Sequence, residues 1–285
     1  MPILNRPAAF IIAASLMISS AHAQYDDIVI QTQAVAGNVS MLIGAGGNIG
    51  VSAGEDGILI IDDQFAPLAG RIQEAIQALG SNVPEFVLNT HFHGDHTGSN
   101  AEFGIDSLII AHENVRSRLQ AGGAEASALP VVTFDDDVTI HFNGEEITLI
   151  HLPAGHTDTD SAVIFSESNV IHMGDHFFNG GFPFVDMANG GSVQGLIKNL
   201  EKAMSWIDDD TQVIPGHGPL ATKADLMTFY GVVKDTSTAI RVMKSQRMSK
   251  EEIVAAGLDP QYESWGQGFI NEQRWIETVY DSYPR

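Results

Sequence analysis

Residues 90–98 read Thr90-His91-Phe92-His93-Gly94-Asp95-His96-Thr97-Gly98, directly after an expected buried strand at Phe86–Leu88. Two histidines that are two positions apart point to the same side of an extended backbone. A glycine permits the sharp bend that brings Asp95 and His96 next to them. The chain has 11 His and no Cys, so any metal ligands are nitrogen and carboxylate oxygen atoms, which suit zinc, iron or manganese. The stretch therefore predicts a metal site in the loop after this strand.

Three more residues of the metal-ligating types follow expected strands further along the chain. They are His156 in Leu152-Pro153-Ala154-Gly155-His156-Thr157, Asp175 in His172-Met173-Gly174-Asp175, and His217 in Val213-Ile214-Pro215-Gly216-His217-Gly218-Pro219. An HxHxDH motif followed in order by His, Asp and His resembles the metallo-β-lactamase-fold hydrolases. The resemblance covers residues 28–219, and it is far more specific for the fold than for the substrate.

The resemblance implies an α/β fold, a four-layer αββα sandwich in which two packed sheets lie between outer helices. The metals are expected at one edge of the sandwich, in loops after strand ends. The expected cofactors are two Zn²⁺ ions per chain, although iron or manganese fits the same ligands. The implied ligands are His91, His93 and His156 for the first ion and Asp95, His96 and His217 for the second, with Asp175 bridging both.

Other polar residues near these motifs have candidate roles. Asp62, at the end of the expected strand Ile58–Ile61, matches a family aspartate that supports the metal loop. We expect it to hold a ligand histidine by a hydrogen bond; a solvated carboxylate is the alternative. His176, directly after Asp175, is a candidate proton donor to the substrate. The remaining histidines after the N-terminal segment are expected to be solvated or structural: His112, His141, His151 and His172.

The implied chemistry is metal-assisted hydrolysis. Two cations held about 3.5–4 Å apart deprotonate a bridging water near neutral pH. The resulting hydroxide is expected to attack a carbonyl carbon, with Asp95 orienting it and carrying its proton. The leading interpretation is a secreted dinuclear zinc hydrolase that acts on an ester, a lactone or an amide-type small molecule. β-Lactamase activity is the alternative, followed by a non-catalytic periplasmic zinc-binding protein and by an interaction module with an acidic surface.

Several features bear on the substrate. The true lactamases of this family usually carry Cys or Ser where this chain has Asp175, and no Lys or Arg occurs from Leu119 to Ile197. A substrate carboxylate would therefore need Arg116, Arg118 or a metal as its anchor. Phenylalanines crowd the segment after Asp175, which either packs into the core or lines a pocket: Phe177, Phe178, Phe182 and Phe184. An apolar pocket favours a neutral ester, lactone or amide over a phosphate.

The chain carries 36 acidic and 14 basic residues, which gives a formal net charge of −22. This charge opposes binding to nucleic acid and to anionic membrane surfaces, because phosphate groups are bound mainly by Lys and Arg. The expected partner is therefore a small-molecule substrate, and the oligomeric state is open.

The N-terminus is typical of a secretory signal peptide. Arg6 precedes an apolar run from Ala8 to Ser20, and Ala21-His22-Ala23 gives an A-x-A cleavage pattern. The run is too short for a membrane anchor, which needs about 20 residues. Cleavage after Ala23 would leave residues 24–285 as one hydrolase domain with C-terminal helices, in the periplasm or outside the cell.

Short and alternating apolar runs predict strands up to residue 214, and helical periodicity dominates after Pro219. Asn143-Gly144 is a strong hairpin signal between two of the strands. The expected strands are Val39–Ile43, Ile49–Ala53, Ile58–Ile61, Phe86–Leu88, Leu108–Ala111, Val131–Phe134, Val138–Phe142, Ile147–Leu152, Ala162–Phe165, Val170–Met173 and Gln212–Ile214. The expected helices are Pro67–Leu79, Glu113–Gln120, Val193–Ile207, Ala221–Met243, Lys250–Ala256 and Asn271–Tyr280.

Overall fold

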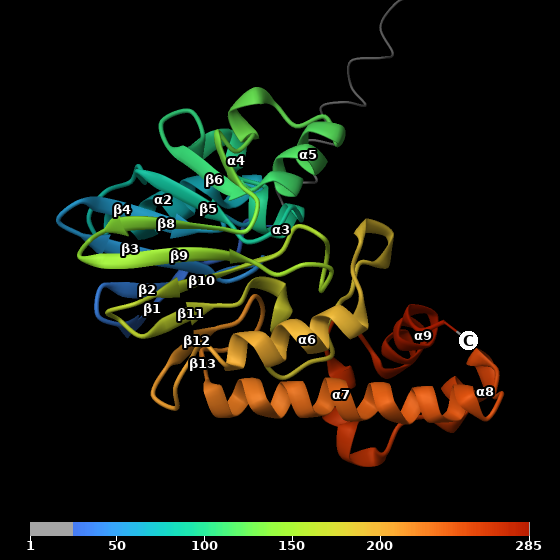
Figure 1. The fold of residues 1–285 in the computed structure, drawn as a ribbon. Coiled ribbons are helices and arrows are strands. Elements are labelled where there is room, and N and C mark those ends of the chain that lie inside the picture. The colour runs from blue at the N-terminus through green and yellow to red at the C-terminus, as the bar shows by residue number, and fades with distance from the viewer. Residues whose placement is uncertain (1–24, 285) are drawn as a thin grey trace, which may run out of the picture.

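Two β-sheets pack face to face, with helices on both outer faces (Figure 1). The computed structural model describes residues 25–284, and the predicted signal peptide lies outside the described residues. The first sheet contains, in chain order, β1 (Gln31–Ala36), β2 (Val39–Ile43), β3 (Ile49–Gly54), β4 (Gly57–Ile61), β5 (Phe86–Asn89), β6 (Leu108–His112) and β7 (Val132–Phe134). The second sheet contains, from one edge to the other, β8 (Asp137–Phe142), β9 (Glu145–His151), β10 (Ser161–Phe165), β11 (Val170–His172), β12 (Gln212–Ile214) and β13 (Ala221–Thr222).

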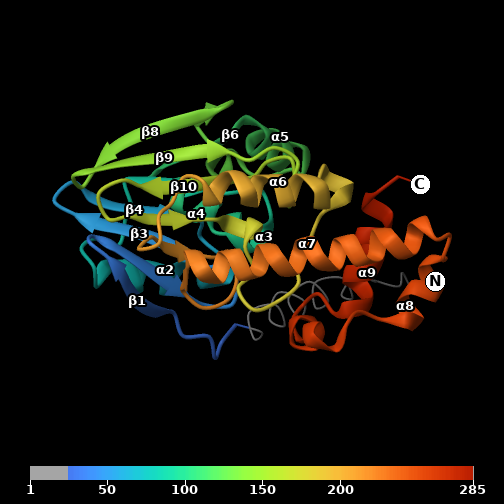
Figure 2. The ribbon, with the colours of Figure 1, turned by 60° about the horizontal axis from the view of Figure 1, so that its bottom comes forward.

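Most of the helical residues belong to eight α-helices in the described part of the chain. These are α2 (Ala69–Gln77), α3 (Gly94–Thr97), α4 (Asn100–Phe103), α5 (Glu113–Ala121), α6 (Val193–Met204), α7 (Lys223–Ser245), α8 (Lys250–Ala256) and α9 (Glu272–Ser282). Short 3-10 helices lie at Ala66–Leu68, Ala126–Ala128, Gly174–His176, Met187–Asn189 and Pro260–Gln267. Helices α6 and α7 run side by side, and α8 and α9 pack at one end of α7 (Figure 2). None of the helices among residues 25–284 has the length and apolar character of a membrane span.

Three apolar clusters separate the four layers. Along β4, Leu59 and Ile61 face the second sheet, while Ile58 and Ile60 pack against α2 on the outside. This alternation is the two-residue period of a strand buried on both faces. The third cluster joins the outer face of the second sheet to α6, α7, α8 and α9. The predicted four-layer αββα sandwich is therefore confirmed.

Most predicted elements are present, with shifts at their ends. The hairpin at Asn143-Gly144 is confirmed, since both residues have the positive φ angles, 55° and 77°, that such a turn requires. The long C-terminal helix begins at Lys223 rather than at Ala221, because Thr222 and Asp225 form a capping box. Strand β1 was not predicted, because its residues are mostly exposed and polar.

Parallel strand pairs bring the predicted site residues to one edge of the sandwich. β4 and β5 run parallel, so Asp62, which directly follows β4, lies beside Thr90, which directly follows β5. In the second sheet, β11 and β12 also run parallel, and Asp175 and His217 follow these two strands. The loops that carry the predicted ligands therefore come from the same ends of strands in both sheets.

Candidate metal centre

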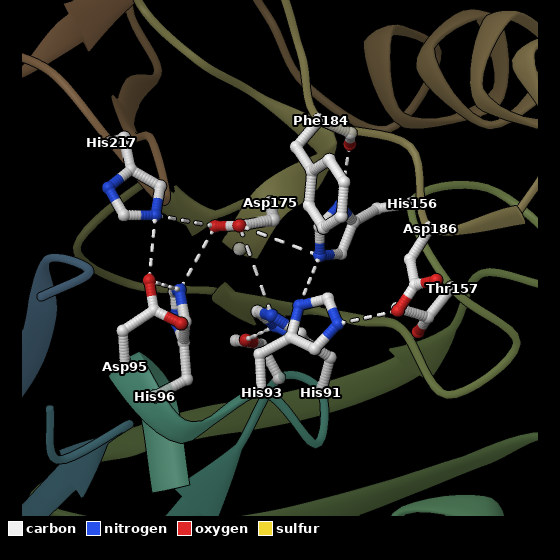
Figure 3. Close-up of polar contacts among 12 residues, drawn as sticks. His91, His93, Asp95, His96, His156, Thr157, Asp175, Phe184, Asp186 and His217 are labelled. Atoms are coloured by element: carbon white, nitrogen blue, oxygen red, sulfur yellow. Dashed lines mark hydrogen bonds and ion pairs between the residues drawn. The ribbon is translucent and has the colours of Figure 1, made fainter. Parts of the chain in front are cut away.

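The seven residues with predicted ligand roles lie together at the edge where the loops of both sheets meet (Figure 3). They form two groups, and within each group the possible ligand atoms lie within 4.8 Å of one another. The first ligand group is His91, His93, His156 and Asp175, and the second ligand group is Asp95, His96 and His217. The structure thus brings together every residue of the predicted ligand sets.

Asp175 belongs to the first ligand group and also approaches the second (Figure 3). Its Oδ1 atom is 3.1 Å from His96 Nε2 and 3.4 Å from His217 Nε2. Its Oδ2 atom is 3.5 Å from His156 Nε2 and 3.9 Å from His91 Nε2. A carboxylate that turns one oxygen toward each group has the geometry of a ligand shared by two cations.

Asp62 orients two of the ligand histidines. It is fully buried, and its Oδ2 atom accepts hydrogen bonds of 2.7 Å from His96 Nδ1 and from the Thr90 hydroxyl. That hydroxyl lies 3.0 Å from His91 Nδ1, from which it accepts a hydrogen bond. These contacts place a ring proton of both histidines on Nδ1 and turn their Nε2 atoms toward the centre. Burial rules out the solvated alternative for Asp62.

Two further contacts hold His93 and His156, and the sequence did not reveal them. Asp186 Oδ2 accepts from His93 Nε2 at 3.0 Å, and the Phe184 carbonyl oxygen accepts from His156 Nδ1 at 2.7 Å. His93 therefore turns its Nδ1 atom to the centre, where it lies 2.9 Å from His156 Nε2. A backbone carbonyl leaves no side-chain signal, and Asp186 is 93 residues away from His93, so neither partner is visible locally in the sequence.

Acceptor atoms without partners point to the centre, as a metal site requires. His91 Nε2, His96 Nε2 and Asp175 Oδ1 are buried and have no hydrogen-bond partner within residues 25–284. Buried polar atoms without partners are costly, so their clustering calls for a ligand. His93 Nδ1 and His156 Nε2 also face each other. The ring protons lie on His93 Nε2 and His156 Nδ1, so two lone pairs meet at the centre, and a cation between them would stabilise this arrangement. Nitrogen and carboxylate donors at this spacing fit divalent ions such as zinc.

Comparison with known protein families agrees with this geometry. The family described as "Metallo-beta-lactamase superfamily" matches residues 44–217, which is more than half of the chain. The chain belongs to the metallo-β-lactamase superfamily. Its fold is also similar to that of a solved metallo-beta-lactamase from Pontibacter korlensis, with a TM-score of 0.63 and 15% sequence identity. That similarity covers 72% of this chain and 99% of the Pontibacter chain.

Curated relatives of this superfamily member are named as hydrolases. Atrochrysone carboxyl ACP thioesterase from Aspergillus chevalieri is 24% identical over 238 residues, which are 82% of this chain and 67% of the relative. Hydroxyacylglutathione hydrolase from Polaromonas sp. is 32% identical over 134 residues, which are 46% of this chain and 47% of the relative. The chain thus spans about half the length of the second relative. With the family match, these similarities show that the protein is a metallo-hydrolase.

The two ligand groups of this superfamily member differ in their electrostatics. Burial, together with the neighbouring His96, lowers the pKa of His91 well below its usual value, and burial lowers the pKa of His156 to about 4. Burial acts in the same direction on His96 and His217, but the Asp175 carboxylate outweighs it. As a result, the pKa of His96 is well above its usual value and the pKa of His217 is raised to about 9. His91 and His156 are therefore uncharged at pH 7, while His96 and His217 hold protons that an incoming cation must displace.

Two glycines leave room for ligand side chains. A Cβ atom at Gly47 would lie 2.1 Å from His96 Cε1, and a Cβ atom at Gly216 would lie 2.2 Å from Asp175 Oδ1. Both separations are far shorter than van der Waals contact, so a larger residue at either position displaces a ligand.

A pocket of about 770 Å³ opens onto the metal centre. The ligands His93, Asp95, Asp175 and His217 line it together with five phenylalanines: Phe65, Phe178, Phe182, Phe184 and Phe269. None of its described lining residues is a lysine or an arginine. The sequence left open whether the phenylalanines after Asp175 pack in the core or line a pocket. Phe177 packs in the core, whereas Phe178, Phe182 and Phe184 line the pocket.

The remaining candidates lie away from this pocket. His176 is buried, its Nε2 atom accepts a hydrogen bond of 2.9 Å from Asn199, and it is not among the lining residues. Its role as a proton donor stays a prediction, and we assign it no step. Arg118 is held by two hydrogen bonds of 2.6 Å to Asp158, and Arg116 donates to the Pro130 carbonyl. Neither arginine is among the lining residues of the pocket, which leaves a metal as the remaining candidate anchor for a substrate carboxylate.

Proposed function

We propose that this protein is a dinuclear, zinc-dependent hydrolase of esters, thioesters or lactones with an apolar acyl group. One observation carries the proposal: seven ligand-type side chains converge beside a pocket of about 770 Å³ that is lined by phenylalanine rings. An apolar pocket with a few convergent polar groups suits a substrate with a polar carbonyl and an apolar remainder. The relatives named as a thioesterase and as a hydroxyacylglutathione hydrolase favour acyl substrates.

The proposed ligands follow the two groups in the structure. The absence of Cys from the chain and the histidine-rich donor set support zinc, while iron and manganese accept the same donors. Asp62 and Asp186 would keep His96 and His93 in their ligating orientations. The proposed set is His91, His93 and His156 for one ion, Asp95, His96 and His217 for the other, and Asp175 for both.

The side chains around the centre suit attack of water on a carbonyl. Two divalent ions held by these residues would supply Lewis acidity and would lower the pKa of water toward neutrality. Asp95 is placed to orient the attacking water and to accept its proton, because it lines the pocket and its carboxylate is 28% exposed. Phe178 and Phe184 keep bulk water from the acyl side of the substrate, which strengthens electrostatic interactions with the carbonyl oxygen.

Hydrolysis of β-lactams is the weaker alternative. The similarity to a solved metallo-beta-lactamase, at 15% identity, shows the fold alone. A β-lactam antibiotic carries a carboxylate, and the described lining of the pocket provides no lysine or arginine to bind it. The interpretation as a non-catalytic zinc-binding protein is contradicted by the family match and by the relatives named as hydrolases.

Two further features of the chain belong to this proposal. Residues 24–285 would form one domain, which is supported by the apolar cluster that joins the second sheet to the C-terminal helices α7, α8 and α9. Residues 1–23 would direct export, which is supported by the apolar run and the A-x-A pattern before Gln24.

The test is turnover by the purified zinc-loaded protein on three substrates in one preparation. An aryl thioester, a neutral acyl lactone and a cephalosporin are compared, each with and without a chelator. We expect chelator-sensitive cleavage of the thioester or the lactone, and little cleavage of the cephalosporin. Preferred cleavage of the cephalosporin would replace the proposal with a β-lactamase. Absence of all three activities in protein with two bound zinc ions would refute the proposed substrate class.

A further inference from the structure

A second, larger groove is lined by residues of α6, α7 and α8 and by the end of α9; Figure 2 shows how these four helices are arranged. Its volume is about 1360 Å³, and it shares no lining residue with the pocket at the metal centre. Six of the 14 basic residues of the chain line it, although the chain has a net charge of −22: Lys198, Lys234, Arg241, Lys244, Arg247 and Lys250. We call this feature the basic groove. Glu251 is the acidic residue among its described lining residues.

Half of these cations are already bound within the protein. Lys234 is 3.5 Å from Glu201, and Lys250 is 2.7 Å from Asp281. Lys244 donates to two backbone carbonyls at the end of α9.

The other three cations of the basic groove are Lys198, Arg241 and Arg247. They come from α6, from α7 and from the turn after α7, and none forms an ion pair within the described part of the chain. Arg241 lies over the ring of Tyr283, with its Cζ atom 4.5 Å from the ring centroid. These side chains therefore present free positive charge from more than one element.

Ser237 gives an independent indication of a ligand. It lines the basic groove, is 1% exposed, and its hydroxyl has no hydrogen-bond partner in the described structure. A buried hydroxyl without a partner costs free energy, and an acceptor oxygen that enters the groove would remove this cost.

We infer that the basic groove binds a phosphorylated small molecule that carries at least two negative charges. Arginine and lysine recognise phosphate oxygens, arginine through paired N–H donors. We infer at least two charges because three cations without ion pairs among residues 25–284 face the groove from α6, from α7 and from the turn after α7, so more than one anionic oxygen can be contacted at once. Apolar and aromatic side chains along the groove would contact the organic part of the ligand: Ile197, Val242, Met248 and Tyr280.

The experiment measures binding of inorganic pyrophosphate to the zinc-loaded protein by calorimetry, at constant ionic strength. Lys198 and Lys202 offer a matched pair of variants, because both lie on α6 but only Lys198 is among the lining residues of the groove. We expect the Kd to rise about tenfold in Lys198→Gln and in Arg241→Gln, in line with lost hydrogen bonds to a charged group. Lys202→Gln, which removes the same charge, should leave the Kd unchanged.

Ser237→Ala separates a bound ligand from general charge attraction. This variant keeps every charge and removes a hydroxyl that has no hydrogen-bond partner, so the fold should tolerate the change. We expect the Kd for pyrophosphate to rise severalfold, because one hydrogen bond to the ligand is lost. Absence of saturable pyrophosphate binding, or equal weakening in Lys202→Gln, would overturn the inference. The inference would also be overturned if the protein forms a dimer through this groove, which would be shown by a dimer that dissociates in the Arg241→Gln variant.

A phosphate group can also belong to a lipid, and a second arm distinguishes that source. The protein is floated with vesicles made of equal parts of phosphatidylcholine and phosphatidylglycerol. We expect it to stay unbound. Flotation that is lost in Lys198→Gln would identify a membrane surface as the ligand and would overturn the inference of a small molecule.

Discussion

The two ligand groups of the metal centre differ in how firmly the protein holds their side chains. In the first group, His91, His93 and His156 each have their other ring nitrogen fixed by Thr90, Asp186 or Phe184. In the second group only His96 is fixed in this way, and Asp95 and His217 are 28% and 32% exposed. The difference teaches that the first group is organised in advance, whereas the second must order its side chains and release protons. We therefore expect the first group to bind its ion more tightly.

The largest effect is expected where the two groups are joined. Asp175→Asn keeps the shape of the side chain but removes the charge that faces both groups. Loss of contacts outside the ligand shell already lowers metal affinity or activity by about 10–100-fold, so we expect kcat/KM to fall by more than about 100-fold. Metal content by mass spectrometry should fall as well. His141→Gln, at a side chain that is 74% exposed, is the control, and a fully active Asp175→Asn enzyme with two ions would contradict the shared-ligand assignment.

Metal removal at different pH values sharpens the comparison. The pKa of His217 is raised to about 9, so its pairs with Asp175 and Asp95 stabilise the metal-free fold below its ordinary pKa of 6.5 and are lost as the pH rises through 9. A cation in the second group must displace this proton and the one on His96, so its affinity should fall by at least about tenfold for each pH unit below 9. The pKa of His156 is lowered to about 4, so the first group should show little change over the same range. Zinc titration against a competing chelator measures both sites, and equal slopes would argue against the difference.

Of the two carboxylates that orient ligand histidines, the more buried one should contribute more to zinc affinity. Asp62 is fully buried and fixes His96 directly and His91 through Thr90, whereas Asp186 fixes only His93 and is partly exposed. We expect Asp62→Ala to weaken zinc binding by about 100-fold and Asp186→Ala by about tenfold. Competition with a chromophoric chelator gives both values. A larger effect of Asp186→Ala would reverse the order that the contacts imply.

The smallest effects on zinc affinity and on stability are expected from alanine substitutions at two glycines, one beside a ligand and one in open space. Gly47→Ala would place a methyl group 2.1 Å from His96 Cε1, and we expect it to weaken the second ion by about tenfold. Gly70→Ala lies within α2 with no atom near its added Cβ, and we expect it to raise the free energy of unfolding by about 0.5–1 kcal/mol. Zinc titration and urea unfolding check the two changes. Unchanged zinc affinity in Gly47→Ala would show that the loop can move aside.

The ligand set was predictable because its residue types are scarce and follow strand ends in a fixed order. Asp95 and His96 are separated from His91 by only a few residues, and parallel strands carry Asp175 and His217 to the same edge. The apolar runs predicted most of the strands, whereas the two packed sheets and the division of the ligands between two ions came from the family resemblance. The motif that carries this resemblance is short and keeps its order along the chain, so it could be found in one sequence.

The parts that escaped prediction depend on contacts between distant segments. The Phe184 carbonyl contributes a backbone atom, and Asp186 looks like any exposed acidic residue until the fold places it beside His93. Phe65 and Phe269 reach the pocket from opposite ends of the chain. The basic groove was equally invisible, because its cations lie on three helices and in one turn. Strand β1 was missed because an exposed polar edge strand lacks an apolar pattern.

Each ligand group also draws side chains from both sheets. Four of the seven residues follow β5 of the first sheet: His91, His93, Asp95 and His96. The other three follow strands of the second sheet: His156, Asp175 and His217. The first sheet is complete before the second begins in the chain, so neither half can hold a full ligand group alone. A full ligand group therefore forms only after the two halves of the chain have docked. Two ions bound as proposed would link the two sheets, and their binding free energy would add to the stability of the docked sandwich.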